Sequence, residues 1–282
     1  MRAVRYDVVV LIRLHRSRAA SALLMGAATA MLIWTLRQED HSPLRQTALP
    51  RSRRQATNLI LGIGSLLMAG RIQRALLTPL FDRRTERRGV VQSLPARWRR
   101  VAAFLLLDWS IYWWHRASHR IPPLWRLHRV HHVDLDLDMS TAIRFHFAEQ
   151  LLSAPVRAAM ILLIGPDART HALWNRFFFA SILFHHANIR LPATMDRILS
   201  LLLTTPRMHG IHHMARRDLT DSNWTSGLSL WDRLHGSFRA DVAPDAVRVG
   251  VPAYTADLGS PDLLMLPMAA PSAADWRAPS SR

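Results

Sequence analysis

Five apolar stretches alternate with arginine-rich segments, and this pattern limits the folds open to the chain more than any other feature. The stretches cover residues 20–36, 57–81, 100–114, 148–165 and 171–184. A helix needs about 20 apolar residues to cross a bilayer, so the shorter stretches would have to be extended by their more polar ends. Arg71 and Arg74 interrupt the second stretch, which leaves open a broken or re-entrant pair instead of one span. Since strand-like alternation is scarce, we predict an all-α integral membrane helical bundle.

The two ends of the chain differ from its centre. The start is basic and then apolar, like a signal peptide, but the apolar stretch continues through Trp34 without a small-residue cleavage site. We interpret it as a retained first membrane helix. Residues 240–282 are rich in Ala, Pro and Ser, which predicts a flexible C-terminal tail. We therefore divide the chain into N-terminal membrane helices with basic loops (1–99), a histidine-rich domain (100–239) and this tail.

Charge and cysteine content exclude several functions. All 37 basic residues are arginine, against 20 acidic residues, and the arginines fall mostly between the apolar stretches. This distribution suits the flanks of membrane helices better than a nucleic-acid-binding face. The chain has no cysteine, which excludes disulfides, thiolate zinc sites and thiol catalysis. Histidine and carboxylate side chains are then the available metal ligands.

Three histidine clusters follow the ends of apolar stretches. The first has H-x-x-x-H spacing, and the second and third both have H-x-x-H-H spacing. On a helix, positions i, i+3 and i+4 share a face, so each cluster can direct its imidazoles toward one point or two adjacent points. Pro123 and Pro206 precede the second and third clusters and suit the first turn of a helix. The clusters are His115 and His119; His128, His131 and His132; and His209, His212 and His213, with His186 ahead of the third.

The number of clustered histidines indicates two metal ions. Eight or nine neutral imidazoles exceed the four ligands of one structural zinc. Imidazole binds iron, zinc, copper and nickel alike, so the ligand type leaves the metal open. The isolated His15, His41, His171 and His235 are interpreted as surface or packing residues.

Further motifs accompany the clusters. An R-x-H segment (Arg144, His146) and an H-x-N element (His186, Asn188) lie between the second and third clusters, and D-x-N and W-D-R-x-x-G motifs close the region (Asp221, Asn223, Trp231, Asp232, Arg233, Gly236). In this order, the motifs over about residues 100–239 resemble those of the fatty acid hydroxylase and sterol desaturase superfamily of membrane enzymes. The central region is therefore expected to be a fatty acid hydroxylase-like histidine-box domain.

The resemblance implies a di-iron centre in a histidine-rich helical cap on the cytosolic side of a membrane domain. We expect the membrane to be the bacterial inner membrane. Such a centre uses O₂ as co-substrate to hydroxylate or desaturate a fatty acyl, sterol or related lipid. Zinc can replace iron in recombinant preparations. The motifs carry the ligand role to His115, His119, His128, His131, His132, His186, His209, His212 and His213. Arg144, His146 and Asn188 are expected to orient ligands or substrate without binding the metal themselves. His185 is next to the expected ligand His186, and its role is less certain.

The expected reaction needs partners beyond the lipid and the membrane. The sequence has no haem, flavin or ferredoxin motif, so the electrons should come from an external protein of ferredoxin or cytochrome type. Nearby carboxylates such as Glu149 and Asp221 should balance charge and hold the imidazoles in one tautomer. No nucleic acid is expected as a partner.

Two other functions stay open on the sequence. A divalent-metal transporter or metal-binding membrane protein would also carry histidines beside membrane helices, but its ligands should lie near the bilayer midplane. A zinc hydrolase would need a general base, yet H-E-x-x-H is absent and no Glu lies inside a histidine box.

Overall fold

The computed structural model describes residues 30, 33–47, 49–81, 88–269 and 273–276, and these residues form helices and connecting loops. No strand occurs among them, and the backbone pairs only in three isolated β-bridges. The expected all-α architecture is thereby confirmed. The predicted span 20–36 lies mostly outside the described residues. Residues 33–41 are described and are helical.

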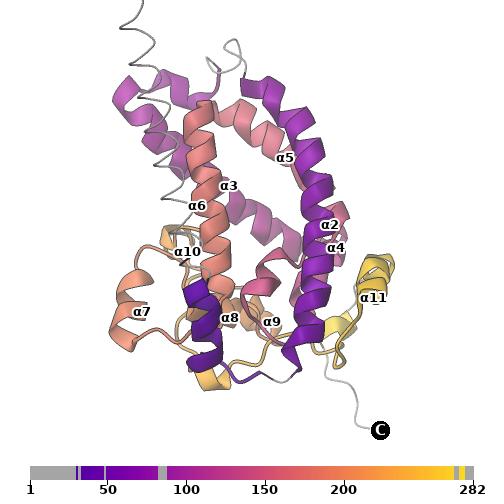
Figure 1. Cartoon of the computed structure of the whole chain (residues 1–282). Helices are drawn as coiled ribbons and strands as arrows, with labels where there is room; N and C mark the ends of the chain where they lie inside the picture. The colour runs from indigo at the N-terminus through magenta and orange to yellow at the C-terminus, as the bar shows by residue number, and fades with distance from the viewer. Residues whose placement is uncertain (1–29, 31–32, 48, 82–87, 270–272, 277–282) are drawn as a thin grey trace, which may run out of the picture.

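Four long helices form the body of the molecule (Figure 1): α2 (Arg51–Leu77), α3 (Ala96–Arg120), α5 (Phe147–Ile164) and α6 (Ala168–His186). Helix α5 packs along α2, and α3 contacts both α5 and α6. Gly165 ends α5 in the left-handed region with φ 74°, and a Cβ there would collide with the carbonyl oxygen of Arg88. The chain can therefore reverse between α5 and α6 over a close backbone contact that only glycine permits.

Among the residues that the structure describes, two segments are long and apolar enough to cross a membrane, namely Arg51–Phe81 and Phe147–Ile164. Helix α2 continues past Arg71 and Arg74, so the alternative of a broken pair is wrong for this stretch. Both arginines are exposed and leave the helical hydrogen bonds intact. Helices α3 and α6 cover the predicted stretches 100–114 and 171–184, but their flanking turns are more polar.

Shorter helices form a cap where α3 and α6 end (Figure 1). The helices are α4 (Pro122–His132), α7 (Ala193–Leu199), α8 (Pro206–His212), α9 (Arg217–Thr220) and α10 (Leu230–Leu234). As predicted, proline stands in the first turn of both α4 and α8. The fixed φ of proline suits that position, where its missing N–H leaves no helical bond unmade.

A buried ion-pair network joins α2 to the segment that follows α4. The side chain of Arg54 is fully buried and pairs with Asp134 at 2.9 Å and with Asp138. Asn58, one turn further along α2, accepts a hydrogen bond from Arg144 at 2.7 Å. Because a buried guanidinium is costly unless paired, this network fixes the cap on α2.

The described part of the C-terminal region, 240–269 and 273–276, is packed, whereas we expected a flexible tail over 240–282. Helix α11 (Ser260–Met265) contributes Leu263 to a buried cluster with Trp125 and Val130 of α4. Asp275 pairs with Arg129 of α4 at 3.1 Å. Apolar side chains from irregularly spaced positions meet on α4, so the burial leaves no periodic pattern in the sequence. Residues 270–272 and 277–282 lie outside the described part of the chain.

Candidate metal centre

The structure brings all nine predicted ligands together in two adjacent groups. Within each group the candidate ligand atoms lie within 4.8 Å of one another, and every side chain is buried. The five-histidine group is His115, His119, His128, His132 and His212, and the four-histidine group is His131, His186, His209 and His213.

Helix geometry explains how each H-x-x-H-H cluster, or box, is divided between the two histidine groups. Successive residues of a helix are turned by about 100°, so residue i+4 points about 40° to one side of residue i, and residue i+3 points about 60° to the other side. In α4, His128 and His132 enter the five-histidine group and His131 enters the other. In α8, His209 and the C-cap residue His213 enter the four-histidine group, and His212 enters the five-histidine group. The i and i+4 histidines of α4 therefore enter one group, whereas those of the α8 box enter the other. Each box contributes histidines to both groups.

Backbone carbonyls fix the tautomers of three imidazoles. Nδ1 of His115 lies 2.6 Å from the carbonyl oxygen of Trp224, and Nδ1 of His212 lies 2.8 Å from that of Ser222. Nδ1 of His186 likewise lies 2.8 Å from the carbonyl oxygen of Ile182. A carbonyl only accepts, so each Nδ1 carries the proton and each Nε2 carries a lone pair. These Nε2 atoms are therefore free to bind a metal ion.

The remaining ring nitrogens fit a metal ion better than hydrogen bonding. In the five-histidine group, Nε2 of His119, His128, His132 and His212 is buried and has no hydrogen-bond partner among the described residues. In the four-histidine group, Nε2 of His186 lies 3.1 Å from Nε2 of both His131 and His209. Nε2 of His186 carries a lone pair and cannot donate a hydrogen bond to either neighbouring nitrogen. A metal ion placed between the three Nε2 atoms can accept a lone pair from each of them. A buried set of neutral nitrogens of this kind suits a divalent transition metal.

Burial keeps these histidines in the form that binds metal. Loss of solvent, with a further contribution from neighbouring imidazoles, lowers the pKa of His132, His209 and His213 well below the usual range. Desolvation lowers the pKa of His186 and His212 to about 3. The imidazoles are then neutral at neutral pH, and their lone pairs are available.

One of the two expected carboxylates supports the centre. Nδ1 of His128 donates to Oε1 of Glu149 at 2.8 Å, and both side chains are buried. This contact is the predicted one, because it holds the ring in one tautomer and raises its basicity. Asp221 does not share this role, which is a correction: it follows α9 and pairs with Arg120 near the surface at 3.1 Å.

The closing W-D-R motif supports the five-histidine group through a loop. The carboxylate of Asp232 accepts hydrogen bonds from the backbone N–H groups of Trp224 at 2.8 Å and Thr225 at 3.0 Å. The same loop supplies the Trp224 carbonyl that holds His115. Asn223 adopts φ 48° there and donates to the carbonyl of Met208 in α8 at 2.9 Å. The sequence identified this motif but gave no sign of its structural role.

The three residues predicted to act behind the ligands lie outside both histidine groups. Nε of Arg144 donates to the carbonyl of Val130, beside His131, at 3.0 Å. The side chain of Asn188 is bonded to the backbone of Arg45 through both of its polar atoms at 2.9 Å. His146 caps α5 by accepting from the N–H of Ala148 at 3.1 Å. The first two contacts hold segments next to the candidate ligands His131 and His186, and the third holds the start of α5, which carries Glu149; none reaches the ligand atoms.

His185 is buried beside the centre without joining either group. Its ring centroid lies 4.0 Å from that of His209, and its Nδ1 has no hydrogen-bond partner among the described residues. It also lines a cavity between α2, α3, α5 and α6.

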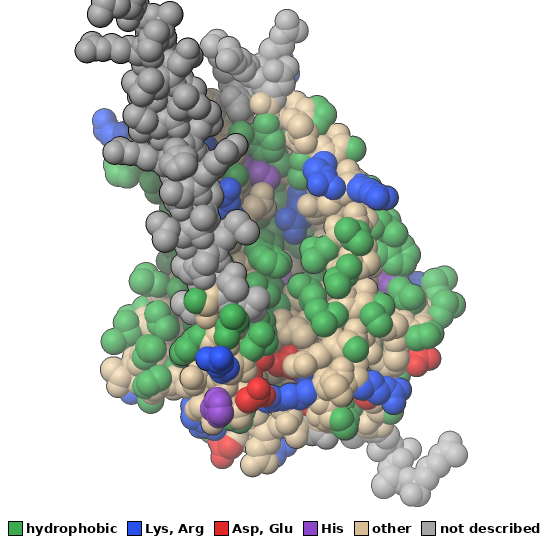
Figure 2. All heavy atoms as spheres, in the orientation of Figure 1, with side chains coloured by type: hydrophobic (Ala, Val, Ile, Leu, Met, Phe, Trp, Pro, Cys, Tyr) green, Lys and Arg blue, Asp and Glu red, His purple; other side chains and the backbone are tan. Residues whose placement is uncertain are grey.

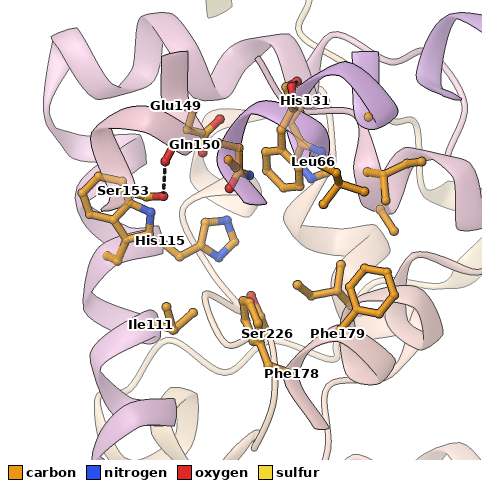
Figure 3. Close-up of a pocket in the computed structure, with 18 of the residues that line it drawn as sticks. Leu66, Ile111, His115, His131, Glu149, Gln150, Ser153, Phe178, Phe179 and Ser226 are labelled. Carbon is orange, nitrogen blue, oxygen red and sulfur yellow. Dashed lines mark hydrogen bonds between the residues drawn. The ribbon is translucent and has the colours of Figure 1, made fainter. Parts of the chain in front are cut away.

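A cavity of about 320 Å³ adjoins both histidine groups and extends between α2, α3, α5 and α6. At one end it is lined by His115 and His128 of the first group and by His131, His186 and His209 of the second. Figure 3 shows Leu66, Ile111, Phe178 and Phe179 around its space, with His115, His131 and Glu149 beside them. The geometry therefore places a candidate metal centre at the end of an apolar-walled chamber.

Part of the chain is similar to known proteins. Residues 100–237 match the fatty acid hydroxylase family, which confirms the resemblance inferred from the boxes. The chain is similar to alkylglycerol monooxygenase of Homo sapiens, with 31% identity over 145 residues, or 51% of this chain and 31% of that protein. It is also similar to ornithine lipid hydroxylase OlsE of Rhizobium tropici, with 28% identity over 158 residues, or 56% of this chain and 46% of that protein.

A third relative is a cholesterol 25-hydroxylase-like protein of Danio rerio, with 27% identity over 143 residues, or 50% of this chain and 55% of that protein. The chain thus spans between about a third and just over half of the length of these relatives. No solved structure matches the chain.

Proposed function

We propose, from the match of residues 100–237 to the fatty acid hydroxylase family, that this chain is an O₂-dependent membrane lipid oxidoreductase with a histidine-ligated di-iron centre. One observation carries the proposal: two groups of buried, neutral histidines adjoin the end of a cavity with apolar walls. A lipid chain in that cavity would bring a carbon atom beside both groups.

The nine histidines would hold two iron ions, five ligands on one side and four on the other. Such ions supply O₂ activation for attack on an unactivated C–H bond, which no side-chain acid or base can achieve. The protein would position the ligands and the substrate and keep water away from the histidines. Glu149 and the carbonyls of Trp224, Ser222 and Ile182 keep the proton on Nδ1 of four rings, so that each Nε2 faces the centre.

The cavity walls would bind the substrate chain and exclude water from the histidines. Leu66 of α2, Ile111 of α3 and Phe178, Phe179 and Ile182 of α6 supply this apolar surface. Each comes from a long helix, and α2 also exposes Ile60 and Leu67 on its outer side. An apolar outer face of this kind suits contact with lipid, so we propose that α2 and α5 cross the membrane. From the resemblance of the histidine motifs alone, we further propose that the cap and its histidines lie on the cytoplasmic side of a bacterial inner membrane.

Hydroxylation is favoured over desaturation by the relatives, since all three are named as hydroxylases or monooxygenases of lipids or as similar to one. A metal transporter would carry its ion sites near the middle of the membrane helices. Here the candidate ligands lie at the ends of α3 and α6 and in the cap, which supports an enzyme. The electrons would come from a separate ferredoxin or cytochrome.

The test is incorporation of oxygen into lipid by membranes that contain the protein. Given ¹⁸O₂ and a reduced ferredoxin or cytochrome, these membranes should place ¹⁸O in a lipid, which mass spectrometry detects. The variants His128→Ala and His209→Ala, one from each group, should abolish the label, while the exposed His41→Ala should retain it. Labelled product that survives loss of His128 and His209 would contradict the proposal.

A further inference from the structure

A charged side chain lies in the apolar cavity at a distance from the histidines. Glu149, Ser153 and Arg157 are spaced four residues apart on α5, and all three line the cavity. At 1.5 Å per residue, Arg157 is about 12 Å further along the helix axis than Glu149, which contacts His128. The cavity thus has the candidate metal centre at one end and a guanidinium group at the other.

Arg157 makes no hydrogen bond or ion pair with any residue that the structure describes, and its Nε is buried without a partner. Its guanidinium carbon lies 5.7 Å from the ring centroid of Phe178. Glu149 is a carboxylate on the same helix face, but it lies two turns away and already accepts from His128. Arg157 as a whole is half-buried, so the rest of its guanidinium can reach into the cavity. A cation without an anionic partner is costly within a candidate membrane helix and points to a ligand.

The surroundings of Arg157 suit an anionic group attached to an apolar chain. The amides of Gln73 and Asn175 line the same cavity from α2 and α6, and both also line a smaller recess beside Arg157. Between this end and the histidines, the walls are Leu66, Phe178, Phe179 and Ile182. Figure 2 shows a hollow in the face between α6 and α2, with basic side chains inside it.

We propose that Arg157 binds the anionic group of the substrate lipid, a carboxylate or a phosphate, and so sets which carbon lies beside the histidines. The proposal rests on the proposed function for the reaction but concerns binding alone. A guanidinium presents paired N–H donors that match two anionic oxygens, and in a cavity with little water this pairing is strong. The apolar walls would then hold the alkyl chain between the two ends.

Binding of three probes with the same chain tests this assignment without O₂ or electrons. Dodecanoate, dodecyl phosphate and dodecanol are titrated into the purified full-length protein in a non-ionic detergent, and heat of binding is measured. We expect at least one anionic probe to bind tenfold or more tightly than dodecanol. The anionic probe with the greater increase in affinity over dodecanol identifies the bound group as a carboxylate or a phosphate.

The variants separate a specific pair from general attraction to a basic protein. Arg157→Gln should remove the preference for the anion and leave dodecanol binding unchanged, whereas Arg157→Lys should keep part of it. Arg176→Gln is the matched control, because Arg176 is exposed on α6 next to Asn175. Equal binding of anions and alcohol by the unmodified protein, or equal losses in Arg157→Gln and Arg176→Gln, would overturn the proposal. If anion binding depends on Arg157 but no lipid is oxidised, the proposed function fails and this assignment stands.

Discussion

Nδ1 of His128 donates to the carboxylate of Glu149 at 2.8 Å, while Nε2 of the same ring is buried with no partner among the described residues. The two ring nitrogens thus face a carboxylate on one side and the five-histidine group on the other. A carboxylate behind a ligating imidazole fixes the tautomer and increases the basicity of the nitrogen that binds metal. Helix α5 therefore contributes to the centre although it carries none of the nine candidate ligands.

Replacing Glu149 should weaken metal binding at the five-histidine group. Loss of a carboxylate partner typically reduces metal affinity by about 10–100-fold. Glu149→Gln keeps an acceptor but loses the charge and should lie at the lower end, whereas Glu149→Leu should lie at the upper end. Competition with a chelator, followed by metal analysis, measures the affinity. Gln150→Ala is the control, and an equal loss in that variant would contradict a specific role for Glu149.

The two histidine groups should lose metal independently. Protein purified anaerobically from iron-replete cells should hold close to two metal atoms per chain. His131→Ala removes a ligand of the four-histidine group and His212→Ala one of the five-histidine group, so each should lower the content by about one atom. Elemental analysis gives the stoichiometry, with the exposed His41→Ala as control. A folded protein with one atom or none would refute the two-metal arrangement.

Asp232→Ala should destabilise the protein and also disturb the five-histidine group. The change leaves the N–H groups of Trp224 and Thr225 without their acceptor, at a cost of about 1–3 kcal/mol for each buried group. The Trp224 carbonyl would then lose its fixed position against His115. Thermal unfolding and metal content are the measurements. The exposed Asp241→Ala should change neither, and normal metal content in Asp232→Ala would show that the loop does not position His115.

The Arg54 network should dominate the attachment of the cap to α2. Arg54→Met leaves the buried Asp134 and Asp138 without their cation, and breaking a buried pair in this way costs about 3–5 kcal/mol. The neighbouring Arg53→Met is the control, since Arg53 is exposed and should change stability little. Unfolding in detergent compares the two variants. Similar midpoints for both would show that the ion pairs contribute little.

Metal-free protein should lose stability as the pH falls below about 6.5. His186 and His212 have a folded-state pKa of about 3 against an ordinary value of 6.5. Between these values the unfolded chain binds more protons than the folded one, so the stability present above pH 6.5 declines toward pH 3, by about 1.4 kcal/mol per pH unit for each such histidine. Thermal midpoints recorded across this range test the slope. A flat profile would contradict burial of neutral imidazoles.

Much of the candidate site follows from the sequence alone. The H-x-x-x-H and H-x-x-H-H spacings are local properties, since a helix turns residues i, i+3 and i+4 toward one side whatever surrounds it. Proline ahead of the second and third boxes marked the starts of α4 and α8 in the same way. The long apolar stretches likewise predicted α2, α3, α5 and α6, because apolar surface must be buried or face lipid.

The tertiary structure decided what those local patterns could not. Identical H-x-x-H-H boxes give His131 to one group and His212 to the other, because α4 and α8 approach the centre from different directions. Asp221 turned toward Arg120 while Glu149 reached His128, although both were equally plausible carboxylates in the sequence. Val251, Leu263, Leu266 and Trp276 packed on α4, and Arg157 came to face the cavity, through contacts between segments far apart in the chain. Such contacts depend on how helices meet in space, and residue spacing along one chain carries no record of it.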